Sequence, residues 1–157
     1  MTTNHRVKLE LFTRDNIKHI FRHTFAMQCQ EGTRTFARNP QVPSTYEHEI
    51  WLRNRLSCRA SSNFWLAWDA TDQYALPLGS IRYDGSGLAP EVSLIISQPC
   101  RNMGYGKAVL RTFLRLHPQM DFSAYIAEQN YASQYCFKEC GFVYLGAGWW
   151  WNSYNTA

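Results

Sequence analysis

The chain has 157 residues, of which 45% are hydrophobic and 15% aromatic, and its formal net charge is +4 at pH 7. A chain of this length and composition can enclose the core of one ordinary domain, which we expect to span residues 1–157. The mild, scattered positive charge is no nucleic-acid footprint, and no apolar run approaches the ~20 residues of a membrane span, so nucleic-acid-binding and membrane-spanning proteins are excluded.

The first part of the chain predicts a strand, a helix and a long loop. Apolar and polar residues alternate over residues 6–12, which is the pattern of a half-buried strand. A short helix is expected over residues 17–25. A glycine and two prolines interrupt the segment 30–43, which is the best candidate for a loop that faces a substrate.

A capping box marks the start of the next helix. The Ser44 hydroxyl can accept a hydrogen bond from the amide of Glu47, while the Glu47 carboxylate can reach back to the Ser44 amide. The helix should continue to about Cys58. Four of its residues fall on one face at i, i+3, i+4 and i+7. These residues are His48, Trp51, Leu52 and Arg55.

Strands and helices then alternate to the end of the chain. Residues 64–68 and 77–84 read as two strands of a hairpin, and a further strand is expected over residues 91–96. The elements expected after it are a helix over 107–116, a strand over 121–127, a helix over 130–140 and strand material over 142–151. This order predicts an α/β domain with a mixed sheet.

The N-terminus and the cysteines indicate a cytoplasmic protein. Polar and charged residues interrupt the first residues, which therefore lack the apolar core of a secretory signal. The five cysteines are scattered and include no CxxC pair. Cys136 and Cys140 lie at i and i+4, but no second ligand pair is spaced to complete a metal site. We expect no metal, and cysteines that pack as small hydrophobic residues.

Two glycines one residue apart, Gly104 and Gly106, lie between the strand over 91–96 and the next helix. The stretch has neither the Walker pattern nor the three glycines of the dinucleotide fingerprint. Its backbone amides could meet an anion at the helix N-terminus, and Arg101 could add charge-assisted contacts. The alternative is a tight strand-to-helix connection in which the glycines serve only the turn.

Read with its neighbours, this stretch resembles the GCN5-related N-acetyltransferase (GNAT) family. One family motif is Arg or Gln, two residues, Gly, one residue, and Gly or Ala; a second is Asn, then a small residue, then Gly-Phe at a helix end. The matching residues are Arg101, Gly104, Gly106, Asn130, Ser133, Gly141 and Phe142. The resemblance covers about residues 77–145 and implies a mostly antiparallel sheet with splayed central strands and helices on both faces.

The resemblance implies that the cofactor is acetyl-CoA. Its pyrophosphate would bind the amides of the glycine stretch, and its pantetheine arm would pair with the preceding strand. Asn130 would contact that arm, with Ser133 near it. The implied cofactor-binding residues are Leu94, Ile95, Ile96, Arg101, Asn102, Met103, Gly104, Tyr105, Gly106, Lys107, Asn130, Ser133 and Phe137.

Acetyl transfer to an amine needs a group that takes the amine proton. The family often uses a strand carboxylate, directly or through water, and Glu91 matches that region; Ser93 shares its side of the strand. The alternative for Glu91 is a solvated charge at a strand end. Weaker candidates for the base are His48, His23 and Asp84, and a lone histidine beside Trp51 is more often a packing residue.

The chain departs from the family at the position of the proton donor. The family's usual donor to the CoA sulfur is a tyrosine seven positions after the motif asparagine, and here that position is Phe137. Tyr135 should face elsewhere, because two helical residues are ~200° apart. Ser133 lies one turn before Phe137 and could donate the proton, or water could. Otherwise no side chain assists, or turnover is poor.

One segment suggests the acceptor. The stretch from Thr33 to Leu56 resembles acetyltransferases that act on nucleotide-linked 4-amino sugars of bacterial surface-sugar pathways, through Arg38, Asn39, Glu47, His48 and Trp51. Aromatic platforms and cations would suit such an acceptor, although each aromatic could equally be a core residue. The expected substrate-binding residues are Arg38, Asn39, His48, Trp51, Arg82 and Tyr83.

Other acceptors and another class of function stay open. A protein or peptide amine, or a drug-like amine such as an aminoglycoside, would favour acidic walls, which the first third of the chain offers sparingly. A CoA-binding module with little turnover is the non-enzymatic alternative. The tryptophans of residues 148–151 could be a core edge or a dimer contact, so we expect a monomer or a homodimer.

Overall fold

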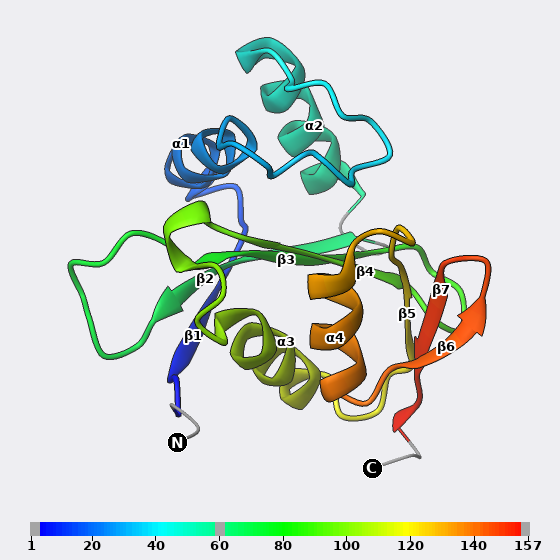
Figure 1. Ribbon diagram of the computed structural model, residues 1–157. Helices are drawn as coiled ribbons and strands as arrows, with labels where there is room; N and C mark the ends of the chain where they lie inside the picture. The colour runs from blue at the N-terminus through cyan, green and yellow to red at the C-terminus, as the bar shows by residue number, and fades with distance from the viewer. Residues whose placement is uncertain (1–3, 59–61, 155–157) are drawn as a thin grey trace.

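The computed structural model describes residues 4–58 and 62–154, so the predicted domain limits at 1 and 157 lie outside the described residues. Its strands form one sheet of order β1-β2-β3-β4-β5-β7-β6 (Figure 1). Neighbouring strands are antiparallel except β4 and β5. The strands are β1 (Val7–Leu11), β2 (Ser62–Asp69), β3 (Gly79–Asp84), β4 (Glu91–Ile96), β5 (Phe122–Tyr125), β6 (Val143–Gly146) and β7 (Trp149–Asn152).

Helices cover both faces of this sheet. In Figure 1, α1 (Ile17–Gln28) and α2 (Thr45–Ser57) lie above it, and α3 (Tyr105–Leu116) and α4 (Tyr131–Glu139) lie below it. A short 3-10 turn, Gln98–Cys100, leads from β4 toward α3. The predicted mixed α/β class, with a mostly antiparallel sheet between helices, is confirmed. No helix of the described residues is long and apolar enough to cross a membrane.

The capping box forms as predicted and fixes the start of α2. The Glu47 amide donates to the Ser44 hydroxyl at 3.1 Å, and the Ser44 amide donates to the Glu47 carboxylate at 2.7 Å. Together they satisfy two of the amides that a helix start leaves without partners. The segment between α1 and α2 contains turns and bends but no helix or strand, also as predicted.

Two hydrophobic clusters, one on each side of the sheet, hold the layers together. The lower one includes Ile81, Val92, Phe113 and Phe122, all buried against α3 and α4. The upper one joins α1 and α2 to β2; its members are Phe12, Ile20, Met27, Leu52, Phe64 and Leu66. Because side chains of a strand alternate between faces, each strand contributes every second residue to one cluster.

The two parallel strands separate along their length. β4 and β5 pair at one register position, Glu91 with Ser123, whereas β3 and β4 pair along all six residues of β4. Beyond Glu91 the β5-facing edge of β4 therefore has no partner strand among the described residues. This is the splay that the family resemblance implies.

The C-terminal strand material folds into a hairpin rather than one strand. β6 and β7 are antiparallel, and Gly146 at the end of β6 and the two residues between the strands, Ala147 and Gly148, all have positive φ. A strand cannot continue through three such residues, since strand φ angles are negative. The prediction of strand structure over 142–151 missed this turn.

Candidate functional site

The glycine stretch forms a left-handed turn at the start of α3. Gly104 has φ +85° and precedes the first helical residue, Tyr105. Ala108 donates to the Gly104 carbonyl at 3.3 Å, so the amides of residues 105–107 come before the first helical hydrogen bond. Such amides, with the helix dipole behind them, attract an anion.

Gly106 lies where three elements meet. A Cβ at this position would be 3.3 Å from Cys136 Sγ in α4, 3.7 Å from Ile96 and 3.9 Å from Leu94 in β4. A larger side chain would press on these packed neighbours and shift the turn. The residues present therefore fit the diphosphate of the predicted cofactor. The amides of residues 105–107 precede the first hydrogen bond of the helix, and a glycine lets an anion approach the backbone closely.

Arg101 ties the glycine stretch to the loop between α1 and α2. Its guanidinium donates to the Ile96 carbonyl at 3.1 Å, to the Glu31 carbonyl at 3.0 Å and to Thr33 Oγ1 at 2.8 Å. Gln30 adds to this tie, since its Oε1 accepts from the Gln98 amide at 2.7 Å. The predicted contact of Arg101 with an anion stays a prediction, and it would have to use the remaining N–H groups.

A residue that the sequence analysis missed braces the same turn. His5 Nε2 lies 2.7 Å from the Met103 carbonyl oxygen, and the His5 ring stacks on Tyr105 with centroids 4.0 Å apart. Asn102, also predicted to bind the cofactor, has φ +61° and is exposed beside Met103. Nothing in the local sequence signals His5, because the contact joins residues 98 positions apart.

Beyond Glu91, β4 and β5 separate and leave a gap between them, and two β4 amides point into this gap. Ser97 donates to the Leu78 carbonyl on the β3 side at 2.8 Å, and alternate amides of a strand point the same way. The amides of Leu94 and Ile96 therefore point toward β5, where that strand has diverged. Ile95, which pairs with Ser80 of β3, directs its amide toward β3 and away from β5, and its predicted cofactor contact stays a prediction.

The predicted cofactor-binding residues at α4 begin with Asn130, which precedes the first residue of the helix. The Asn130 side chain accepts from the Ser133 amide at 3.3 Å and so caps the helix. Ser133 is half-buried, whereas Phe137 is only 4% exposed and packs against Phe142 with ring centroids 4.9 Å apart. Phe137 thus offers little surface to a cofactor, and cofactor contacts of Asn130 and Ser133 stay predictions.

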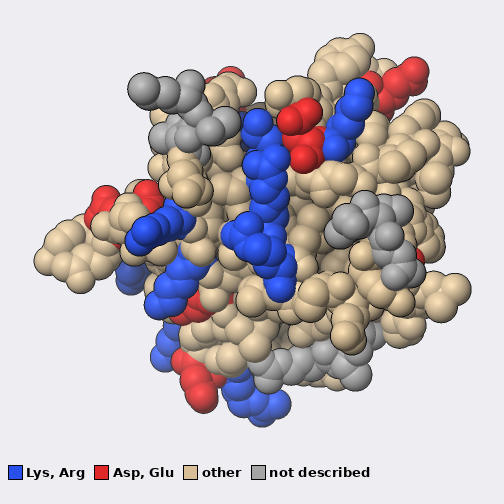
Figure 2. Space-filling view, turned by 90° about the horizontal axis from the view of Figure 1, so that it is seen from below, with Lys and Arg blue, Asp and Glu red and all other residues tan. Residues whose placement is uncertain are grey.

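Basic side chains cover the outer face of α3. Lys107, Arg111 and Arg115 follow at i, i+4 and i+8, and the two arginines are exposed. Figure 2 shows the face that α3 and α4 form, where Lys and Arg side chains gather near the middle. Lys107 lies over the ring of Tyr135, 5.2 Å from its centroid. The positive charge of this face begins at the helix end that carries the free amides.

On the opposite face of the sheet, Glu91 pairs with a cation from a distant loop. Its carboxylate accepts from Arg38 Nη2 at 2.9 Å, and the Glu91 side chain is 25% exposed. Ser93 shares its side of β4, as predicted, because Val92 between them is buried in the lower cluster. The predicted base therefore lies on the α1 and α2 side, at the point where β4 and β5 separate.

Two aromatic rings complete the surroundings of Arg38. Its guanidinium carbon lies 5.0 Å from the ring centroid of Tyr125 and 5.9 Å from that of Trp149, and the two rings are 5.5 Å apart. We call Arg38, Glu91, Tyr125 and Trp149 the Arg38 cluster. The sequence analysis missed both rings. Tyr125 shares its face of β5 with Ser123 and pairs directly with Trp149 on β7.

The tryptophans of residues 148–151 divide between the two faces. Trp150 is buried in the lower cluster, while Trp149 is 39% exposed in the Arg38 cluster. The alternatives of a core edge or a dimer contact were therefore incomplete, since alternation along β7 gives neighbouring tryptophans different roles.

Tyr83, which was predicted to bind the acceptor, lies on the face of the sheet opposite Glu91. It follows Arg82 on β3 and so points to the other face, where its ring packs 6.1 Å from that of Phe113. Asn39 is exposed in the loop, where its backbone oxygen accepts from Arg34 and its Oδ1 accepts from the Gln41 amide at 3.0 Å; its contact with the acceptor stays a prediction.

His48 was predicted to bind the acceptor and was a weaker candidate for the base, and the structure places it inside the protein, away from Glu91. It is 3% exposed between α1 and α2, with Nε2 at 2.7 Å from Thr24 Oγ1. Burial, and then the charge of Arg34, lower the pKa of His48 to about 4. Its imidazole is therefore neutral and internal at pH 7.

Asp84 binds two arginines rather than acting as a free carboxylate. Arg55 donates to Oδ1 at 2.7 Å and Arg82 to Oδ2 at 2.9 Å. Burial alone would raise the pKa of Asp84, but the two positive charges and their hydrogen bonds outweigh it and lower that pKa. Trp51, half-buried, lies 4.9 Å from Arg55 and 5.4 Å from Arg82, so these residues form a structural network on α2 and β3.

The remaining candidates also lie away from the splay. His23 packs edge-on against Trp68 of β2, two strands from β4, and burial with the nearby charges of His19 and Arg22 lowers its pKa. The thiol of Cys136 has a raised pKa because of its hydrogen bond to Cys140 and its burial. Within residues 4–58 and 62–154 no group of three or more His, Cys, Asp or Glu could hold a metal ion.

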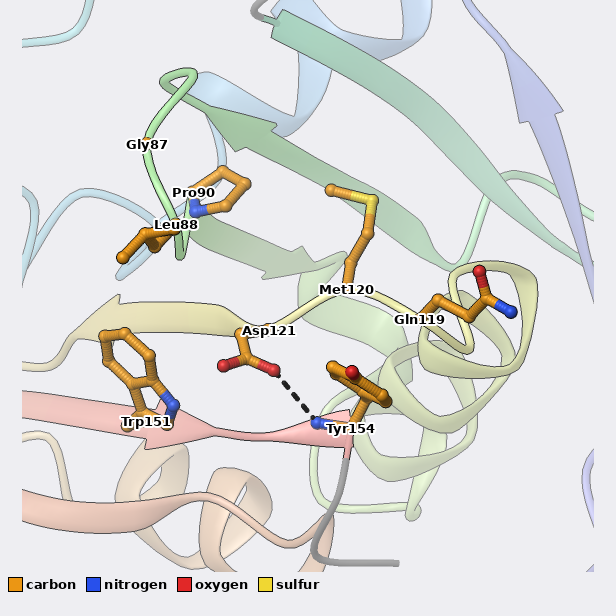
Figure 3. Close-up of a pocket in the computed structure, with 8 residues that line it drawn as sticks. All are labelled: Gly87, Leu88, Pro90, Gln119, Met120, Asp121, Trp151 and Tyr154. Carbon is orange, nitrogen blue, oxygen red and sulfur yellow. Dashed lines mark hydrogen bonds between the residues drawn. The ribbon is translucent and has the colours of Figure 1, made fainter.

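A cavity of about 430 Å³ opens at the other end of β4 from the glycine stretch. Figure 3 shows its lining, in which the Asp121 carboxylate accepts from the Tyr154 amide at 3.1 Å. No predicted site residue lines it. Its lining residues are Gly87, Leu88, Pro90, Gln119, Met120, Asp121, Trp151 and Tyr154.

The chain matches a known protein family. A family model described as "Acetyltransferase (GNAT) domain" matches residues 6–143, which is most of the chain. No curated protein sequence matches.

Solved structures share the fold at low sequence identity. Spermidine N-acetyltransferase from Vibrio cholerae, in complex with CoA and spermine, has a TM-score of 0.72 at 16% identity over 89% of this chain and 82% of that one. Aminoglycoside acetyltransferase AAC(6')-Ib with coenzyme A has a TM-score of 0.77 at 14% identity over 94% and 95%. RimL, a ribosomal alpha-N-protein acetyltransferase with coenzyme A, has a TM-score of 0.75 at 12% identity over 98% and 96%.

Proposed function

The chain belongs to the GNAT acetyltransferase family, and we propose that it transfers the acetyl group of acetyl-CoA directly to a primary amine of a small molecule. The enzyme class and the cofactor follow from the family; the kind of acceptor is the proposal. The observation that carries it is the Glu91 carboxylate, which lies at the splay, on the face opposite the basic helix, and whose partner is a cation.

Each part of the site has a role in this reaction. When bound, acetyl-CoA supplies a thioester whose acetyl carbon forms a bond with the amine nitrogen as the carbon–sulfur bond breaks. The amides of residues 105–107 would hold its diphosphate, and those of Leu94 and Ile96 its pantetheine arm.

Protons must also be accounted for. A protonated amine loses two protons on becoming an amide, the departing thiolate gains one, and one is released to solvent. Glu91 would take the first proton from the ammonium group, since its carboxylate faces the acceptor side. Ser133, one turn before Phe137 on α4, would give the proton to the thiolate in place of the family's tyrosine.

A small amine is better supported than a large or anionic acceptor. Solved neighbours of this fold are named as spermidine and aminoglycoside acetyltransferases, whose acceptors are small amines. The nucleotide-linked 4-amino sugar is a second candidate, favoured by Arg38 and Arg82 as cations for a diphosphate. Burial of His48 and the orientation of Tyr83 leave fewer residues for it than predicted. A monomer or homodimer and a cytoplasmic location also stay predictions.

The test is acetyl-CoA-dependent release of CoA thiol with a panel of acceptors: spermidine, an aminoglycoside, a nucleotide-linked 4-amino sugar, a peptide amine and no acceptor. We expect a small cationic amine to drive release. Glu91→Gln should lower kcat/KM by about 100-fold, as loss of a proton acceptor does. Glu49→Gln, which removes the exposed partner of Arg53, is the matched control and should leave the rate unchanged.

Two outcomes would contradict this proposal. Release driven by the peptide alone would give the chain a macromolecular acceptor. Tight binding of acetyl-CoA without release by any amine would favour the CoA-binding module.

A further inference from the structure

The guanidinium of Arg38 has the surroundings of a bound cationic ligand. A carboxylate oxygen lies 2.9 Å from it, and two aromatic rings lie within 6 Å of its central carbon. Carboxylate and aromatic faces are the groups with which proteins recognise ammonium and guanidinium ions. In the Arg38 cluster, however, the cation in these surroundings is a side chain of the protein and not a ligand.

The two halves of this arrangement differ in how they are held. Glu91, Tyr125 and Trp149 all belong to strands of the sheet, and Tyr125 and Trp149 are paired neighbours across β5 and β7. Arg38 comes from the irregular segment between α1 and α2, and its side chain is 62% exposed. The carboxylate and rings are thus a fixed receptor, and the arginine is the part that can leave.

We propose that Glu91, Tyr125 and Trp149 form the subsite for the ammonium group of the acceptor, and that Arg38 fills this subsite until an acceptor displaces it. This inference rests on the proposed function, because Glu91 is the carboxylate that would take the proton of that ammonium group. The class of ligand is an alkylammonium ion. Arg38 then occupies the position of the ammonium group of the substrate and does not itself bind the substrate.

Displacement requires only a change in the Arg38 side chain. Arg34 donates to the backbone oxygen of Asn39 and to the side chain of Gln28 at the end of α1, so the turn next to Arg38 is anchored to a helix. An exposed ion pair contributes little net stability, because water screens both charges and the long side chain loses rotamer freedom. An acceptor ammonium can therefore replace the guanidinium with the same carboxylate and the same rings.

Two roles for Arg38 predict opposite effects of its removal. If Arg38 binds an anionic part of the acceptor, such as a nucleotide diphosphate, Arg38→Ala weakens acceptor binding. If Arg38 fills the ammonium subsite, the same substitution removes a competitor and strengthens binding. The direction of the change in KM distinguishes these roles.

The experiment compares wild type, Arg38→Ala and Arg53→Ala. Arg53 is a matched control because its side chain is 61% exposed and pairs with a glutamate on α2. Circular dichroism first checks that each variant is folded. For the amine that the wild type acetylates, we expect KM to fall at least threefold in Arg38→Ala and to stay unchanged in Arg53→Ala. A KM that rises or does not change in Arg38→Ala overturns the proposal.

A second measurement does not depend on turnover. Methylguanidinium, which carries the head group of arginine, is titrated calorimetrically at low salt into each variant. We expect binding at least fivefold tighter in Arg38→Ala than in wild type, and loss of this gain in Arg38→Ala with Glu91→Gln. Equal binding in wild type and Arg38→Ala contradicts the subsite. If no amine is acetylated, the proposed function fails, and this titration alone decides whether the ammonium subsite exists.

Discussion

The two sides of the splay between β4 and β5 are built in different ways. The proposed cofactor side consists mainly of one continuous stretch, from Leu94 to Lys107, with Cys136 of α4 beside Gly106. The proposed acceptor side is assembled from residues far apart in the chain, namely Arg38, Glu91, Tyr125 and Trp149. A local turn can be recognised from its own residues, whereas an assembled site depends on strand order and register.

The difference also concerns charge. On the cofactor side, backbone amides and the basic residues of α3 present positive charge to an anion. On the acceptor side, a carboxylate and two rings surround a positive group. In the proposed function, the splay therefore separates an anion-binding side from a cation-binding side, as transfer from acetyl-CoA to an amine requires.

The largest expected effect comes from breaking the cofactor side at Gly106. In Gly106→Val, the new side chain enters the space bounded by Cys136, Ile96 and Leu94, so the turn that carries the amides of residues 105–107 must shift. We expect acetyl-CoA binding, measured by calorimetry, to weaken at least 100-fold, which is about 2.7 kcal/mol. Gly87→Val is the control, since a Cβ there has no heavy atom within 4 Å. Unchanged affinity in a folded Gly106→Val would show that the diphosphate binds elsewhere.

On the acceptor side, Asp84→Asn tests whether the network beside α2 is structural. It leaves Arg55, which is 8% exposed, without its carboxylate, so urea unfolding should show a loss of about 1–3 kcal/mol. The rate of acetyl transfer should stay near that of wild type. Asp15→Asn, at an exposed position before α1, controls for loss of one charge. A fall in rate of about 100-fold with normal stability would instead identify Asp84 as the base.

The smallest effect concerns pH and His48. Its pKa is about 4 in the folded state and near 6.5 when unfolded, so the unfolded chain binds the extra proton first as pH falls. The stabilisation is complete above pH 6.5 and is lost progressively toward pH 4. The free energy of unfolding should therefore decline over this window in wild type and decline less in His48→Gln. His19→Gln, on the surface of α1, is the control; equal slopes in all three would contradict burial of a neutral His48.

Sequence reasoning succeeded where the signal was local. The capping box of Ser44, the strand over 91–96 and the glycine turn each depend on neighbouring residues, and each is present. The family's second motif likewise places Asn130 at a helix start, where its side chain caps α4. These features need no knowledge of the rest of the molecule.

Sequence reasoning failed where two faces had to be told apart. Arg82 was predicted to bind the acceptor as a cation and Tyr83 as an aromatic platform, but adjacent strand residues point in opposite directions. The alternation itself is readable, yet which face carries the site depends on where α1 and α2 pack. Trp149 could not be assigned for the same reason, since its partner Tyr125 is known only from the pairing of β5 with β7.

The hydrogen bonds that join residues 30–33 to Gln98 and Arg101 matter for protein engineering. Arg101 donates to Glu31 and Thr33, and Gln30 accepts from Gln98, so the segment that carries Arg38 is hydrogen-bonded to the segment that we propose meets the cofactor. A chimera that imports a new α1–α2 loop to change acceptor choice therefore also changes the support of the cofactor turn. Grafts that keep residues 30–33 native are the ones that will retain acetyl-CoA affinity.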